Sequence, residues 1–139
     1  MSRSETILKL VLRLSGLVLL LAFPAALLPV EWMAATHRWL GLGEFPASPL
    51  VDYMTRSASV LYGIHGGLLL VLAHRPRRFR AAIAYLAGMN LLAGVALVVI
   101  DVRAGLPWIW VIAEGPSVFA FGVLVLALLR GLPRDQSEG

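Results

Sequence analysis

The sequence predicts an all-α fold, a four-helix transmembrane bundle, from its composition, its four long apolar stretches and the placement of its basic residues. Of the 139 residues, 59% are hydrophobic and 14% are charged, whereas roughly 25% of the residues in a soluble domain are charged. The mean hydropathy is +0.82. So apolar a composition is typical of a membrane protein, and we expect residues 1–139 to form a single integral membrane domain.

Four stretches are long and apolar enough to cross a bilayer, which takes about 20 helical residues. They cover about residues 10–28, 50–73, 81–100 and 106–129. A helix satisfies every backbone polar group inside lipid, and the stretches lack the alternating pattern of barrel strands. Each stretch is therefore predicted to be a transmembrane helix.

The basic residues that flank these spans are unevenly distributed, which predicts the orientation. Nine lie at the N-terminus, between the second and third spans, or after the fourth, and two lie in the other connections. Lysine and arginine favour the cytoplasmic side. Both termini and the HRPRRFR loop should therefore face the cytoplasm, in a multi-pass protein of the bacterial cytoplasmic (inner) membrane. The nine are Arg3, Lys9, Arg13, Arg75, Arg77, Arg78, Arg80, Arg130 and Arg134; the two are Arg38 and Arg103.

The first span follows basic residues, as the apolar core of a secretory signal peptide does. Its core, from Leu14 to Val30, exceeds the usual length of about 7 to 15 residues. Pro24 and Pro29 fit a kinked helix. We therefore expect this span to be retained, whereas cleavage would leave three spans.

The connection after the first span, PVEWMAATHRWLGLGEFPASP, is the longest in the chain. Trp32 and Trp39 are seven residues apart and would share one helical face, and tryptophan favours the membrane interface. A short interfacial helix from about Val30 to Leu40 is predicted in this first external loop, ended by Gly41 and Gly43. It is either an anchor or a lid over an external cavity.

Charged residues inside the spans predict a network in the external half of the bundle. Asp52 and Arg56 are four residues apart, so they share a helical face in an order that favours an ion pair. Arg56 lies about 9 Å inward from Leu50 and Glu114 about 10 Å inward from Pro107, at about 1.5 Å per residue. We predict that Asp52 and Glu114 share Arg56, with Asp101 at the rim.

This predicted network has a structural and a functional interpretation. The charges would neutralise one another and fix how the helices pair, since an isolated charge in a span costs several kcal/mol. Alternatively, a hydrated pocket would bind an anionic or zwitterionic ligand, or move a proton through Glu114. Pro116 cannot donate to the carbonyl of Ile112, so the fourth span should kink or loosen beside Glu114.

Polar and small residues predict contacts between helices. Ser59, Gly63 and Gly67 recur every four residues, a small-residue stripe that allows close approach of two helices. Asn90, near mid-membrane, should hydrogen-bond to another helix. His65 lies on the opposite face of its helix from Arg56 and should contact an adjacent span or a partner.

Several classes of site and partner are not expected. The chain has no cysteine, and its three histidines lie at different depths, so we expect no metal and no cofactor. No catalytic motif is present. The pI of about 10.3 reflects basic residues beside the spans, so we do not expect nucleic acid as a partner.

Three segments, LPVEWMAATHRWLGLGEFP, YMTRSASVLYGIHGG and DVRAGLPWIWVIAEGP, resemble small uncharacterised four-span bacterial membrane proteins. The layout of four helices is also loosely similar to that of DoxX-like proteins. The first resemblance covers nearly the whole chain and implies no known activity.

The sequence leaves three functions open. The first is a non-enzymatic binding or accessory component, and the second is a small oligomeric transporter that uses Glu114 and Arg56. The third is an enzyme that acts on a lipid-soluble substrate, with Asp101 or Glu114 as the acid. The expected partners are the lipid bilayer and either further copies of the chain or another membrane protein.

Overall fold

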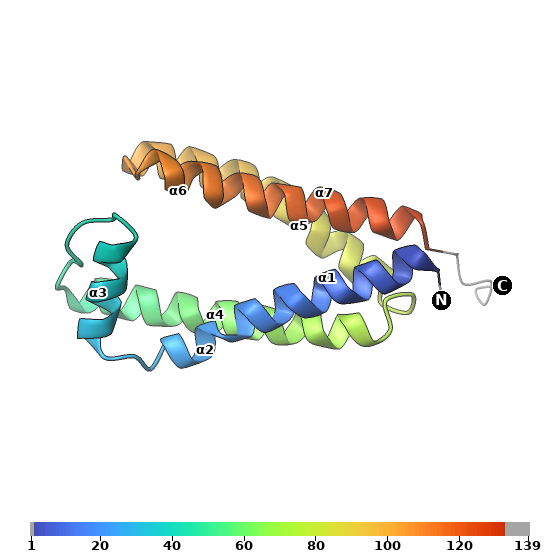
Figure 1. Cartoon of the computed structure of the whole chain (residues 1–139), viewed down its shortest axis with the longest axis horizontal. Coiled ribbons are helices and arrows are strands. Elements are labelled where there is room, and N and C mark those ends of the chain that lie inside the picture. Colours follow the sequence, from blue (N-terminus) through green and yellow to red (C-terminus); the bar gives the residue numbers. More distant parts are fainter. Residues whose placement is uncertain (1, 133–139) are drawn as a thin grey trace. The chain divides into compact units, whose positions relative to one another are not determined.

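A computed structural model of the chain describes residues 2–132, and all of its regular elements there are helices. Four helical segments are long and apolar enough to cross a membrane: Arg3–Ala25, Pro49–His74, Arg80–Ala104 and Trp108–Arg130. They overlap the four predicted spans, so the all-helical prediction is confirmed (Figure 1). Arg134, one of the nine basic residues that predict the orientation, lies outside the described residues.

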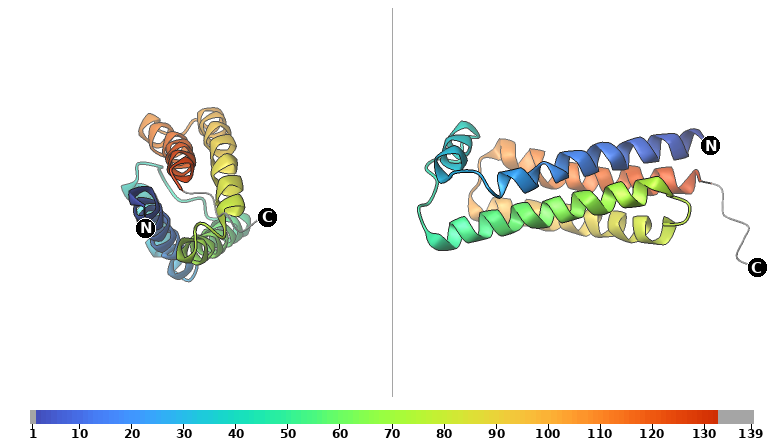
Figure 2. Two further views of the ribbon diagram at one scale, coloured as in Figure 1. Left: turned by 90° about the vertical axis from the view of Figure 1, so that its right-hand side faces the viewer. Right: turned by 90° about the horizontal axis from the view of Figure 1, so that it is seen from below.

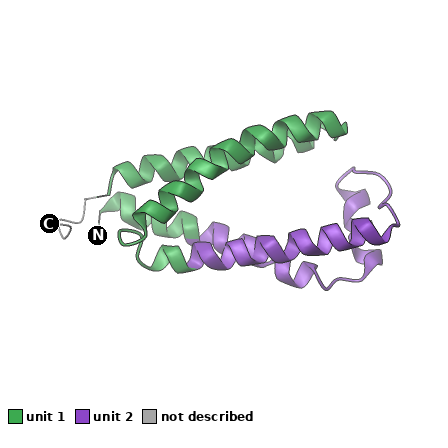
Figure 3. Cartoon of the chain, turned by 180° about the vertical axis from the view of Figure 1, so that it is seen from behind, with its two compact units in different colours: residues 1–12, 71–139 green, residues 13–70 purple. Residues whose placement is uncertain are grey.

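The chain divides into two compact units (Figure 3). Of the described residues, unit 1 comprises 2–12 and 71–132, and unit 2 comprises 13–70. The helices are α1 (Arg3–Leu20), α2 (Ala22–Ala25), α3 (Val30–Trp39), α4 (Pro49–His74), α5 (Arg80–Ala104), α6 (Trp108–Ala113) and α7 (Gly115–Arg130). Whether residues 1–139 act as a single domain stays a prediction.

Within unit 2, the segments of α1 and α4 pack closely through glycines. A Cβ atom on Gly66 would lie 2.6 Å from the carbonyl oxygen of Gly16, and one on Gly63 would overlap the ring of Phe23. Such contacts leave no room for a side chain. Gly67 faces open space, so the predicted stripe was wrong at this position, and Gly66 makes the close approach instead.

Prolines interrupt or begin several helices. Pro24 has no N–H to donate to the carbonyl of Leu20, and α1 ends at Leu20 before α2 resumes. Pro29 adopts an extended conformation (φ −56°, ψ 146°) and precedes α3. Pro49 begins α4, where the backbone N–H of Val51 donates to Ser48 Oγ at 3.1 Å, a serine N-cap.

The helix α3 lies across the direction of α4 within unit 2 (Figures 1 and 2). It coincides with the helix predicted from about Val30 to Leu40, and Gly41 and Gly43 follow it with φ of 75° and 83°. The loop folds back on the helix, because His37 Nδ1 lies 3.0 Å from the carbonyl oxygen of Gly43. An interfacial position for α3 stays a prediction.

Within unit 1, the chain reverses after α5 and returns as α6 and α7 alongside it (Figure 1). Gly105, with φ 70°, ends α5 in the left-handed conformation that glycine adopts readily. A Cβ atom on Gly94 would lie 2.7 Å from the carbonyl oxygen of Gly115, so α5 and α7 also meet through glycines. The core of this hairpin includes Ile83, Ala87, Val111, Val125 and Leu129.

Candidate functional site

Arg56 is held by two hydrogen bonds within unit 2. Its Nε donates to Asp52 Oδ1 at 2.9 Å, the pairing expected from the four-residue spacing. Its Nη1 donates to the carbonyl oxygen of Ala26 at 2.7 Å. The guanidinium therefore ties α4 to the chain just after α2, and hydrogen bonds from a charged donor are stronger than neutral ones.

The carbonyl of Ala26 accepts this bond because the helix stops there. In a continuing helix this oxygen would accept from Val30, four residues later, but the chain turns away at Pro29. Ala26 is 6% exposed, so its carbonyl would otherwise be buried without a donor. Sequence reasoning missed this contact, although a proline shortly after an apolar helix signals carbonyls that need donors.

Glu114 lies where the fourth span is interrupted. It follows the last residue of α6 and precedes the first residue of α7, so the helix is interrupted at the position where a kink or a loosening was predicted. The indole Nε1 of Trp110 donates to Glu114 Oε2 at 2.6 Å. We did not predict this bond, although the two residues are four positions apart on one helical face.

Asp101 is the most deeply buried of the four predicted network residues. The residue is 3% exposed, and its Oδ2 has no hydrogen-bond partner in the part of the chain that the structure describes. A buried acceptor without a donor costs about 1–3 kcal/mol, and more when it is charged. Asp101 lies near the end of α5, where its own carbonyl accepts from the backbone N–H of Leu106 at 3.1 Å.

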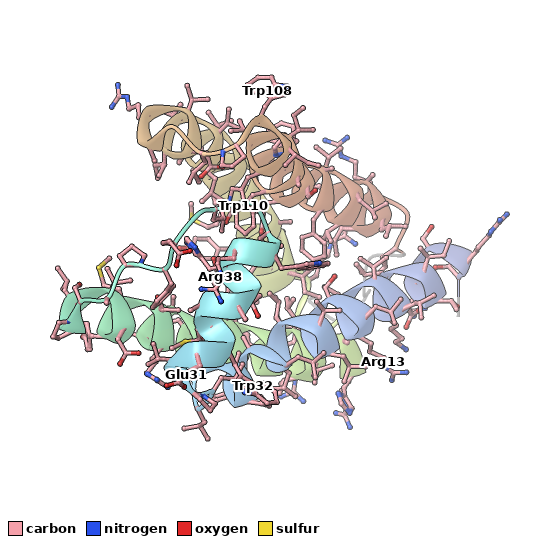
Figure 4. All side chains as sticks on the ribbon, turned by 60° about the vertical axis from the view of Figure 1, so that its left-hand side comes forward. Arg13, Glu31, Trp32, Arg38, Trp108 and Trp110 are labelled. Carbon is pink, nitrogen blue, oxygen red and sulfur yellow. The ribbon has the colours of Figure 1, made fainter. Side chains whose placement is uncertain are left out.

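The structure therefore joins Asp52 to Arg56 in unit 2 and places Asp101 and Glu114 in unit 1. The sharing of Arg56 between Asp52 and Glu114 stays a prediction. Figure 4 shows Trp108 projecting outward from α6, and this residue is 69% exposed. Trp32 on α3 is 65% exposed and likewise points outward (Figure 4).

The three residues predicted to make polar contacts between helices are all half-buried. The side-chain Nδ2 of Asn90 donates to the carbonyl of Leu86 at 2.8 Å, so this hydrogen bond stays within α5. Asn90 nevertheless lies beside α7, because a Cβ atom added to Gly122 would lie 3.3 Å from the Cβ of Asn90. Within residues 2–132, the side chains of Ser59 and His65 form no hydrogen bond between α4 and a second helix.

A second charged cluster, which sequence reasoning missed, lies in unit 1. The carboxylate of Glu5 accepts from Lys9 Nζ at 3.1 Å, and from Arg77 Nε at 3.0 Å and Nη2 at 2.6 Å. The sequence signal was an acid four residues before Lys9. Lys9 and Arg77 entered the sequence-based prediction only as indicators of orientation.

Within residues 2–132, no group of three or more His, Cys, Asp or Glu side chains could hold a metal ion. No family model, no curated protein and no solved structure matches this chain. The site combines a guanidinium at Arg56 that makes two hydrogen bonds, a glutamate at an interrupted helix, and a buried carboxylate oxygen that lacks a donor among the described residues.

Proposed function

We propose that the chain is a four-span protein of the cytoplasmic membrane, with both termini in the cytoplasm, that acts as a non-enzymatic binding or accessory component. Four helices of sufficient length and apolarity support the membrane assignment. The excess of basic residues at the termini and in the loop between α4 and α5 supports the orientation.

The observation that carries the binding role is the buried Oδ2 of Asp101. The chain keeps a carboxylate where no described residue donates to it, at a cost that an apolar residue would avoid. An ammonium, guanidinium or hydroxyl group from a second membrane-spanning chain would satisfy this oxygen once the Asp101 side chain turns outward from its buried position. We therefore place the binding site for a partner at the end of α5.

A photoreactive amino acid at Val102, which is 56% exposed beside Asp101, tests this proposal in membranes of cells that make the protein. We expect a cross-link to a partner chain that Asp101→Asn abolishes. The matched control is Asp52→Asn, because Asp52 already has its partner in Arg56. Equal cross-linking in the wild type and Asp101→Asn would contradict the assignment.

Labelling of single cysteines tests the orientation, because the chain has no cysteine of its own. A membrane-impermeant maleimide should label Ala47→Cys, before α4, in intact cells. It should label Ser2→Cys only in inverted vesicles. The opposite pattern would overturn the orientation and leave the site at Asp101 untouched.

A second function, an oligomeric transporter, is favoured by one observation: the fourth span is interrupted at Glu114. Interrupted helices with unsatisfied carbonyls form many transport sites. The size of the protein in lipid nanodiscs separates the two proposals, because four spans rarely enclose a pathway alone. A single copy per disc argues against transport, whereas an oligomer whose proton flux is abolished by Glu114→Gln supports it.

A further inference from the structure

A basic cleft lies in unit 1, where the loop between α4 and α5 meets the first turns of α1. Its volume is about 470 Å³. The end of α4 and the start of α1 both contribute to its lining. The lining residues are Glu5, Lys9, His74, Arg75, Pro76, Arg77 and Arg78.

Glu5 holds the wall of this cleft together without neutralising it. The side chain of Glu5 is 6% exposed and bridges Lys9 on its own helix to Arg77 in the loop. The lining sets four basic side chains, Lys9, Arg75, Arg77 and Arg78, against the one carboxylate of Glu5, so its formal charge is positive. The same contact fixes the loop against α1, so the cleft is built before any ligand arrives.

The other arginines of the loop divide into two kinds. Arg80 Nη1 donates to the carbonyl oxygen of Leu132 at 3.2 Å, just after α7 ends, so Arg80 has a structural role. Arg75 and Arg78 are exposed, and neither forms an ion pair with a carboxylate of residues 2–132. The guanidinium carbon of Arg78 lies 6.0 Å from the ring centroid of Phe79, a contact that orients the side chain and leaves its charge intact.

We propose that this cleft binds the phosphate headgroup of an anionic lipid. Guanidinium groups match phosphate oxygens in geometry and charge. Three helices that could cross a membrane begin or end beside the cleft, α1 at Arg3, α4 at His74 and α5 at Arg80. A site at these helix ends lies at the depth of the headgroups, where basic pockets recognise anionic lipids. Either orientation of the chain in the membrane would satisfy this proposal.

The test compares two pairs of exposed arginines with equal loss of charge. The first variant is Arg75→Gln with Arg78→Gln, and the matched control is Arg3→Gln with Arg130→Gln, outside the cleft. Native mass spectrometry of the purified protein measures the binding of phosphatidylglycerol and of phosphatidylcholine. We expect the first variant to lose about 30-fold in affinity for phosphatidylglycerol, which corresponds to about 1 kcal/mol for each arginine.

The control pair should lose less than about 3-fold, since distant exposed charges are screened. Equal losses in the two pairs, or equal binding of the two lipids to the wild type, would overturn the proposal. Inorganic phosphate at 10 mM should not displace the lipid. Displacement would identify a soluble anion as the ligand and overturn the lipid assignment.

A measurement on the wild type tests the proposal even if the variant Arg75→Gln with Arg78→Gln fails to insert into the membrane. Phosphatidylglycerol with a photoreactive headgroup should attach to residues 74–78 in vesicles. Attachment confined to the tryptophan-bearing helices α3 and α6, or spread evenly over all exposed basic residues, would contradict a site at this cleft.

Discussion

The two units both carry charged groups within apolar helices, but Arg56 in unit 2 has partners for its charge, whereas Asp101 in unit 1 has a carboxylate oxygen without one. Arg56 donates to Asp52 and to the carbonyl of Ala26, both in unit 2. Asp101 in unit 1 is more deeply buried, and its Oδ2 has no partner among the described residues. Both units pack helices through glycines, so they differ in how their charges are satisfied and not in how their helices meet.

The neighbours of each group along the chain explain this difference. Arg56 has an acid four residues before it, and Pro29 frees a carbonyl at the end of the helix beside α4. Asp101 has only apolar or small residues three and four positions away, and none has a side-chain donor: Leu97, Val98, Ala104 and Gly105. Local sequence thus provides Arg56 with Asp52, whereas it offers the Asp101 carboxylate no side-chain donor.

The largest effect is expected from Arg56→Ala. The substitution removes both hydrogen bonds and leaves Asp52 and the Ala26 carbonyl without their donor. We expect the free energy of unfolding to fall by about 2–3 kcal/mol, less than for a fully buried pair, because the two side chains are 31% and 38% exposed. Unfolding in mixed detergent micelles measures this change. The control is Arg103→Ala, an exposed arginine on α5, for which we expect less than about 0.5 kcal/mol.

A double-mutant cycle extends this test to the predicted sharing of Arg56. If Glu114 also contacts Arg56, Arg56→Ala with Glu114→Gln should recover part of the stability lost by Arg56→Ala alone. Purely additive effects would show that Arg56 is satisfied within unit 2. The same cycle with Asp52→Asn should show clear coupling, since these two residues are bonded.

The glycine contacts should give the next largest effects, and they test whether the two units pack alike. Gly66→Ala would place a Cβ 2.6 Å from two backbone atoms, and Gly94→Ala one 2.7 Å from backbone and side-chain atoms. We expect each to lose about 2 kcal/mol of unfolding free energy, the usual scale of overpacking. Gly67→Ala should cost nothing or add up to about 1 kcal/mol, because alanine favours helix and the space is open. A loss at Gly67 equal to that at Gly66 would restore the stripe predicted from the sequence.

That glycine stripe shows what a sequence can predict for this fold. The sequence predicts the length of the spans and their helical structure, because these depend on local composition. It also predicts the ion pair of Asp52 with Arg56 from their spacing, and the break at Glu114 from the missing N–H of Pro116. Whether Gly66 or Gly67 makes the close contact depends on how α1 is rotated against α4. The bond from Arg56 to Ala26 depends on the position of a helix end thirty residues away. Helical periodicity alone does not determine such tertiary contacts.

Two matched substitutions should change stability in opposite directions. Asp52→Asn weakens the bond to Arg56 and should cost about 1 kcal/mol. Asp101→Asn removes a buried charge without a donor, so the purified protein should become more stable by about 1 kcal/mol. Thermal unfolding of both variants in the same detergent measures the difference. A large loss of stability for Asp101→Asn would show that the carboxylate already has a donor and would remove the basis for a partner site there.

The indole bond at the break of the fourth span should contribute no more than these two substitutions. Trp110→Phe keeps the aromatic ring and removes the donor to Glu114 Oε2, so it should cost about 1 kcal/mol of unfolding free energy. Trp108→Phe is the control, because Trp108 points outward and is 69% exposed; it should have no effect. If Trp110→Phe is neutral while Glu114→Gln is destabilising, Glu114 has a stronger partner than Trp110. Glu114 would then be satisfied from outside its own sequence neighbours, as we infer for Asp101.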